Sequence, residues 1–175
     1  MPPEGSPQAA GFGILIRMQP MLRWACAAAL LVSLASSASA QEFRKTSWLM
    51  SKNQVIASEG ARLVSEQDLK GNQEEIVFQS YLAGFPVTIT YLLENDALLS
   101  ASYTFHRDVD RAAWDAMKQD LRSRNGPPAF EQEDLVGWRL PKTEVALAHL
   151  KDATTYVAYW EKSYFARINN LPPGR

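Results

Sequence analysis

Two histidines are the side chains best suited to acid–base or metal chemistry in this sequence. His106 and His149 lie far apart, and neither belongs to a His-x-His or His-x-x-x-His pair. A two-histidine zinc site on one helix or strand is therefore not expected. His106 lies close to Asp108, and a histidine with nearby carboxylates could act as a general acid or base. The isolation of both histidines favours capping or surface roles, and an enzyme that uses His106 with nearby carboxylates is the alternative.

The motifs of nucleophilic, phosphate-binding and calcium-binding sites are missing. The chain contains no Gly-x-Ser-x-Gly elbow and no Ser-x-x-Lys pair, and no glycine-rich loop precedes a predicted helix. Asp108, Asp110 and Asp115 resemble the start of a calcium loop. An EF-hand needs glycine at its sixth position and glutamate at its twelfth, where Ala113 and Gln119 stand. The sequence therefore predicts no metal site and no cofactor.

Aromatic side chains are concentrated in the last third of the chain. They are Trp138, Tyr156, Tyr159, Trp160, Tyr164 and Phe165. In a strand, Tyr156, Ala158 and Trp160 share one face, while Val157 and Tyr159 share the other. Both faces cannot be core in a simple two-layer fold, so at least one aromatic side chain is expected at a binding surface. The candidate binding residues are Trp138, Tyr156, Tyr159 and Trp160, and the alternative is that these residues complete the core.

The elements that must position these residues begin with a capped helix. Ser51 is predicted as its N-cap, and Gln54 completes a capping box. Met50 and Val55 have the spacing of a hydrophobic staple, and Gly60 after Glu59 predicts a left-handed end.

A second helix is predicted to start at an Asp110 cap. Val109 and Trp114 have the spacing of another staple, and Asn125–Gly126 ends the helix.

Alternating apolar and polar residues predict strands between and after the helices. The candidate strands are 62–67, 75–82, 87–93, 99–105, 135–140, 144–150 and 154–160, and 161–170 is compatible with strand or helix. Short connections indicate antiparallel neighbours, and the Ser and Thr faces suggest that one side of the sheet meets water. The predicted fold class is α+β, with two helices packed on an antiparallel sheet of about six to seven strands. Residues 41–170 are expected to form a single domain, followed by a disordered tail at 171–175.

The segment before this domain has the three parts of a secretory signal peptide. Residues 21–23 give a positive start, 25–34 are apolar, and Ala38-Ser39-Ala40 precedes Gln41 as a cleavage site. The apolar run is about half of the roughly 20 residues that a spanning helix needs. Residues 21–40 are therefore predicted to be removed on export to the periplasm or the medium, and residues 1–20 are expected to be an over-extended N-terminus.

The single cysteine and the charge pattern exclude several classes of function. Cys26 lies at the start of the apolar run, whereas a lipoprotein cysteine follows that run, so neither lipid attachment nor a disulfide is expected in the mature chain. From Gln41 onward charges of both signs are scattered without a basic stripe, which disfavours nucleic-acid binding.

The segment Trp48-Leu49-Met50-Ser51-Lys52-Asn53-Gln54-Val55 resembles the Trp-Gly-Met-Ser-x-x-x-Val helix start of small exported bacterial proteins. These include the superfamily of the outer-membrane assembly lipoprotein and the β-lactamase-inhibitor-like fold. The resemblance implies helices packed on an antiparallel sheet and a protein-binding role. Leu49 stands where those proteins often have glycine, and the lipoprotein cysteine is missing.

Taken together, the sequence predicts an exported, non-enzymatic domain that binds a protein or envelope component. A periplasmic enzyme and a small-ligand carrier are the alternatives, and an enclosed apolar cavity would favour the carrier.

Overall fold

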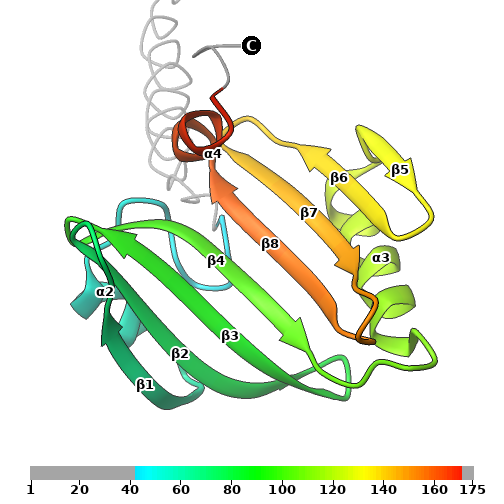
Figure 1. The fold of residues 1–175 in the computed structure, drawn as a ribbon, viewed down its shortest axis with the longest axis horizontal. Coiled ribbons are helices and arrows are strands. Elements are labelled where there is room, and N and C mark those ends of the chain that lie inside the picture. The colour runs from blue at the N-terminus through cyan, green and yellow to red at the C-terminus, as the bar shows by residue number, and fades with distance from the viewer. Residues whose placement is uncertain (1–41, 171–175) are drawn as a thin grey trace, which may run out of the picture. The chain divides into compact units, whose positions relative to one another are not determined.

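The structure is a computed structural model that describes residues 42–170 (Figure 1). The predictions for the N-terminus, the signal peptide with its site at Ala38, Ala40 and Gln41, and the tail at 171–175 lie outside the described residues. Among the described residues no helix is long and apolar enough to cross a membrane.

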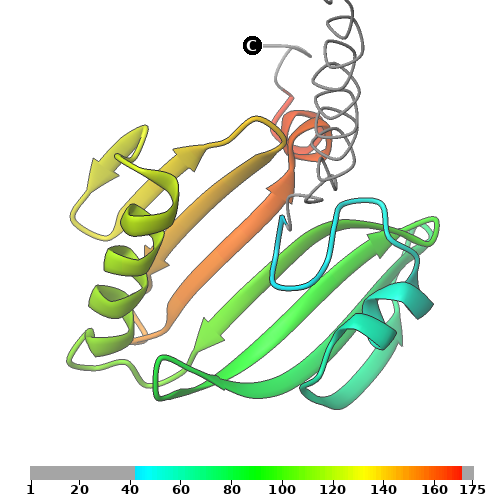
Figure 2. The ribbon, with the colours of Figure 1, turned by 180° about the vertical axis from the view of Figure 1, so that it is seen from behind.

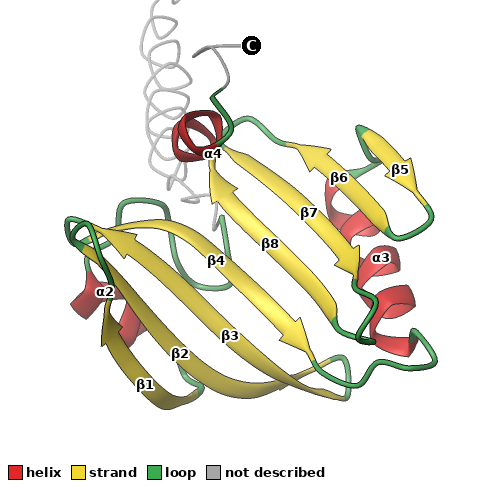
Figure 3. Cartoon of the chain, in the orientation of Figure 1, coloured by secondary structure: helices red, strands yellow, loops and turns green. Residues whose placement is uncertain are grey.

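The described residues form one antiparallel sheet of eight strands together with three helices (Figure 3). In chain order the elements are α2 (Lys52–Ser58), β1 (Arg62–Asp68), β2 (Gln73–Leu82), β3 (Phe85–Glu94), β4 (Ala97–Phe105), α3 (Ala112–Asn125), β5 (Phe130–Gln132), β6 (Leu135–Arg139), β7 (Thr143–His149), β8 (Thr155–Glu161) and α4 (Lys162–Ile168). The spatial order is β1-β2-β3-β4-β8-β7-β6-β5. Each half is thus a helix followed by a four-stranded meander, and the halves meet where β4 pairs with β8.

The predicted α+β class with an antiparallel sheet is confirmed, but the sheet has eight strands instead of six to seven. The additional strand is β5, which has three exposed residues and is too short to show an alternating pattern. The segment 161–170 forms the third helix, because the Glu161 carboxylate accepts a hydrogen bond from the Tyr164 N–H and so caps its start.

Helices α2 and α3 pack against the same face of the sheet (Figure 2). Alternate strand residues point toward them and form the core with the apolar sides of both helices. The buried side chains include Val55, Ile76, Phe78, Ile89, Tyr91, Tyr103, Phe105, Trp114, Met117, Leu121, Val145, Leu147 and Val157. Full burial of a large apolar side chain is worth about 1.5–3 kcal/mol, so this face accounts for most of the driving force for folding.

The segment 42–50 lies on the helix side of the sheet and contacts both halves. The Phe43 ring lies 4.7 Å from the ring of Tyr103 on β4 and 4.9 Å from that of Tyr159 on β8, measured between centroids. The Trp48 Nε1–H donates to Thr143 Oγ1 on β7 over 2.9 Å. This segment therefore reinforces the junction of the two halves.

Helix α2 begins as predicted but ends differently. Both hydrogen bonds of the Ser51–Gln54 capping box are present. At the other end Gly60 is not left-handed. Glu59 is extended instead, which directs its carboxylate inward to Arg44 Nε (2.8 Å) and to the hydroxyl of Tyr91 (2.8 Å). Burial, helped by the Glu59 charge, raises the pKa of Tyr91, so this phenol keeps its proton and donates it.

A β-bulge makes the start of β4 differ from the predicted alternation of apolar and polar residues. The register pairs Leu93 with Leu98 and Leu92 with Ser100, so Leu99 is the extra residue of β4. Leu98 is consequently in the core, and Leu99, expected there with Ala101, is partly exposed. The serine face was expected to meet water, yet Ser100 and Ser102 are buried.

Asp108, and not Asp110, caps helix α3. Its carboxylate accepts hydrogen bonds from the N–H groups of Ala113 and Trp114 (both 2.9 Å) and from the hydroxyl of Thr155 on β8 (2.6 Å). Asp108 is 6% exposed, whereas Asp110 is exposed and makes no capping contact. Asp108 therefore fixes the start of α3 to the centre of the sheet.

Replacing this cap should be costly. We expect Asp108→Ala to lower the free energy of unfolding by about 2–3 kcal/mol, because it removes a helix cap and leaves buried donors without an acceptor. Urea unfolding followed by circular dichroism measures the change. Asp110→Ala is the matched control and should change stability by less than about 0.5 kcal/mol. An equal loss in both variants would contradict the assignment.

The same carboxylate should make stability fall in acid. Burial acts to raise the pKa of Asp108, but the hydrogen bonds from Thr155, Ala113 and Trp114 outweigh it and lower the pKa. The contribution is therefore complete above the unfolded value of about 4 and is lost as the pH falls through the folded value. Unfolding curves between neutral pH and the acid range should show this decline in the wild type and a smaller one in Asp108→Asn. If the wild type and Asp108→Asn lost stability equally in acid, the Asp108 carboxylate would not be the source of the pH dependence.

Candidate functional site

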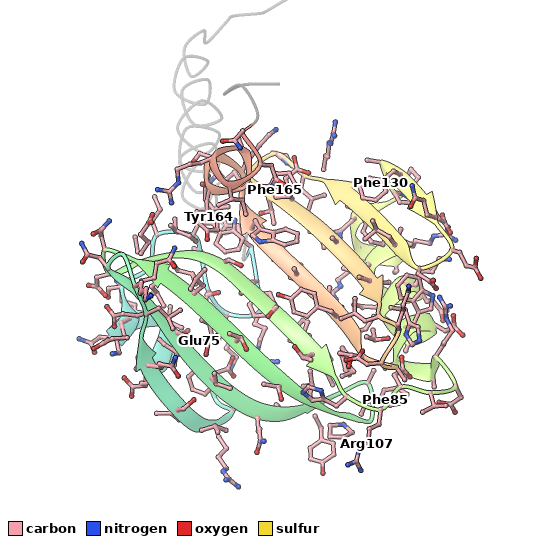
Figure 4. The ribbon with its side chains drawn as sticks, viewed as in Figure 1. Glu75, Phe85, Arg107, Phe130, Tyr164 and Phe165 are labelled. Atoms are coloured by element: carbon pink, nitrogen blue, oxygen red, sulfur yellow. The ribbon has the colours of Figure 1, made fainter. Side chains whose placement is uncertain are left out.

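One face of the sheet carries neither α2 nor α3, and small side chains run across it. The strand register aligns Thr90, Ser102, Ala158, Ala146 and Gly137 on five neighbouring strands. These residues alternate with core residues, so they face away from α2 and α3. We call this face the open face and these five residues the small-residue row. Figure 4 views the molecule from this side.

Aromatic side chains flank the row on the open face. Tyr156 and Trp160 lie two positions to either side of Ala158 on β8, and both are partly exposed. The Trp160 ring lies 5.4 Å from the ring of Phe165 on α4. Helix α4 lies at the end of the open face, where Arg167 forms an ion pair with Glu94 of β3. Phe165 and Tyr164 are labelled in this region in Figure 4.

Phe130 lies beside the other end of the row. It pairs with Gly137, and a Cβ built on Gly137 would lie 2.0 Å from Phe130 Cε1. Glycine at position 137 therefore leaves the space that the ring occupies. Phe130 is still 44% exposed, so its ring adds apolar surface to the open face.

The four aromatic residues predicted as binding candidates divide between the two faces. Trp138 is 1% exposed on the helix-covered face, where its Nε1–H donates to the Gly126 carbonyl over 3.1 Å. Tyr159 is 6% exposed and packs against Phe43, and burial raises the pKa of its hydroxyl. These two are core residues and cannot contact a partner in the folded chain. Tyr156 and Trp160 remain as candidates, and the alternation along β8 predicted this division.

His149 belongs to a buried hydrogen-bonded chain with Asp108 and Thr155. The Thr155 hydroxyl has one proton, which it donates to Asp108, so its oxygen accepts the hydrogen bond from His149 Nδ1 (2.9 Å). The residue types are those of a hydrolase triad, but Thr155 is 0% exposed and its hydroxyl faces the carboxylate. The chain ties β7, β8 and α3 together and presents no accessible nucleophile. Within residues 42–170 no three His, Cys, Asp or Glu side chains are grouped so that they could hold a metal ion.

His106 lies apart from that chain, in a groove with two arginines. The groove has a volume of about 600 Å³. We call it the basic groove, and its polar and charged lining residues include Arg62, Gln79, Tyr81, Thr88, His106 and Arg107. None of its lining residues is acidic. Within the described chain, neither hydrogen bonds nor ion pairs join His106 to a carboxylate, and Asp108 points to α3 instead.

Sequence reasoning singled out His106 but missed the rest of the basic groove. Arg62 and Arg107 lie at the start of β1 and after the end of β4, and only the folded meander places them on one groove. No local motif contains them. The alternation of β2 and β3 did place Gln79, Tyr81 and Thr88 on the polar side of their strands, which is the only signal that pointed to them.

Comparison with protein-family models, curated proteins and solved structures gives no match to this chain. The superfamily resemblance therefore rests on residues 48–55 alone.

The contact between Phe130 and Gly137 gives a direct test of the open face. Gly137→Ala should displace the Phe130 ring and lower the free energy of unfolding by about 1 kcal/mol, because a methyl group is forced into occupied space. In a Phe130→Ala background the same substitution should cost less, since the obstacle is gone. Thermal or urea unfolding of the four chains measures this coupling. An equal cost in both backgrounds would show that the ring does not occupy this position.

Proposed function

We propose that this chain is an exported, non-enzymatic domain that binds a protein of the cell envelope through its open face. The observation that carries the proposal is the partly exposed pair Tyr156 and Trp160 beside a row of small side chains on a sheet face without α2 and α3. Tyr and Trp are enriched where protein interfaces gain most of their binding energy.

The small-residue row supports close approach of a partner. Ala146 and Thr90 are the partly exposed members of the row, whereas Ser102, Ala158 and Gly137 are buried, so a partner would contact the row at Ala146 and Thr90. Trp160 with Phe165 flanks the row, and Phe130 lies beside its Gly137 end, so these rings supply larger apolar contacts.

The resemblance at residues 48–55 supports the same role. Proteins that share this helix start often carry glycine where this chain has Leu49. Leu49 has a φ of 68°, a left-handed value that glycine adopts without strain. The chain therefore bends at this position as a glycine would allow, and the resemblance implies a protein-binding domain.

Export is supported by the position of the signal pattern. The predicted cleavage after Ala40 leaves Gln41 and Glu42 before Phe43, whose side chain is 2% exposed in the core. The cleaved chain would thus keep every residue that the core uses.

A bulky charge on the open face should abolish binding. We expect Ala146→Arg to lower the affinity for the partner at least about tenfold, which corresponds to roughly 1.4 kcal/mol of binding free energy, because it places a guanidinium within the small-residue row. The partner is first identified by a photo-cross-linking residue at position 156 in living cells, and its affinity is then measured by calorimetry with purified proteins.

Ala57→Arg is the matched control, since Ala57 is exposed on α2 and receives the same substitution. It should bind as the wild type does. Trp160→Ala provides a second test that removes an apolar contact and introduces no charge. If Ala146→Arg and Trp160→Ala both fold and bind with wild-type affinity, the open face is not the binding surface.

A further inference from the structure

The basic groove continues the open face toward the end of the sheet opposite α4. The register aligns Arg62, Gln79, Thr88, Thr104 and Tyr156 in one row across five strands. The first three line the groove, and the last is the aromatic residue of the proposed interface. A ligand that covers Tyr156 and extends along this row therefore reaches the groove. Arg107 is labelled at this end of the sheet in Figure 4.

The charge of the groove has no counterpart in the described chain. Neither Arg62 nor Arg107 has an acidic side chain within ion-pair distance among residues 42–170, whereas Arg44, Arg111 and Arg167 each have one. A guanidinium offers five N–H donors in a fixed planar arrangement that matches a carboxylate. Around the two arginines stand the imidazole of His106, the amide of Gln79 and the hydroxyls of Tyr81 and Thr88.

Arg107 is one of ten described non-glycine residues that have a positive φ. Its φ is 60°, in the left-handed region that costs a residue with a Cβ on the order of 1 kcal/mol. Glycine would adopt this turn without cost, but it would remove the second cation from the groove. The sequence thus keeps a charged side chain at a position where the backbone favours glycine.

We propose that the basic groove binds an acidic segment of the partner protein, with Asp or Glu carboxylates paired to Arg62 and Arg107. This inference rests on the proposed function and names the chemistry of the partner. Side-chain carboxylates in the groove and apolar side chains on the small-residue row would belong to one extended segment. The charged end would guide the encounter, and the apolar part would supply most of the affinity.

The size of the groove's charge favours a peptide over larger anionic surfaces. Segments that bind anionic lipids typically carry about four to eight Lys or Arg residues, and nucleic-acid sites need similar clusters. This groove has two arginines and one histidine. Its volume suits a few side chains, since ligand pockets commonly hold about 300–1,000 Å³.

The test uses the purified chain and a fluorescein-labelled hexaglutamate peptide, followed by fluorescence anisotropy at low ionic strength. The wild type should bind this peptide, and hexaglutamine should not bind. The double variant R62Q/R107Q should weaken binding at least about tenfold, because both charge-assisted pairs are lost. The control K70Q/K151Q removes the same net charge from two exposed lysines at other turns and should bind within about twofold of the wild type.

A second arm uses the partner identified by cross-linking and separates this inference from the proposed function. If Ala146→Arg abolishes partner binding while R62Q/R107Q leaves it unchanged, the open face binds but the acidic-segment inference is wrong. If R62Q/R107Q lowers the affinity for the partner and K70Q/K151Q does not, the inference is supported. Equal loss in the two double variants would show a general charge effect and overturn it. Arginine-dependent binding of phosphatidylglycerol vesicles or inorganic phosphate, without binding of hexaglutamate, would overturn it as well.

Discussion

The pairing of β4 with β8 is the constraint on which the rest of this structure depends. Six residue pairs, from Ser100–Trp160 to Phe105–Thr155, join two meanders that would otherwise be separate four-stranded sheets. Because β4 and β8 are the last strands of their halves, joining them places α2 and α3 on the same face of one sheet (Figure 2). The aromatic rings of Phe43, Tyr103 and Tyr159 fill the junction on that face. The other face carries neither α2 nor α3 (Figure 2).

Two buried carboxylates each lie at a helix end, and that of Asp108 also reaches across the junction to β8. Asp108 is bound by α3 and by Thr155 of β8, and Glu59 at the end of α2 is bound by Arg44 and Tyr91. A buried carboxylate is tolerated only where donors satisfy it, so each cluster fixes a helix end relative to the sheet. The histidine and threonine beside Asp108 therefore have a structural role. Arg62 and Arg107, which have no acidic partner among residues 42–170, lie at the end of the open face.

Patterns of neighbouring residues in the sequence correctly predicted features that depend only on those neighbours. The Ser51–Gln54 capping box and the alternation that separates Tyr156 and Trp160 from Tyr159 are visible in adjacent residues. Features that depend on distant segments were missed. The bulge at Leu99 follows from pairing with β3, the Asp108 cap from a hydroxyl on β8, and the basic groove from the order of four strands. Trp138 was placed among the binding candidates because it belongs to the aromatic-rich last third of the chain, and its hydrogen bond to the Gly126 carbonyl at the end of α3 could not be seen in the sequence.

The central claim is that the open face is free in the isolated chain and covered by a partner in the cell. Cysteine labelling tests it most directly, because Cys26 is the only native cysteine and a Cys26→Ser background makes each introduced thiol unique. In purified protein, Ala146→Cys and Ala57→Cys should both react with a membrane-permeable maleimide. In living cells, the thiol at position 146 should be protected, while that at position 57 reacts as before. Equal labelling of both positions in cells would contradict the account.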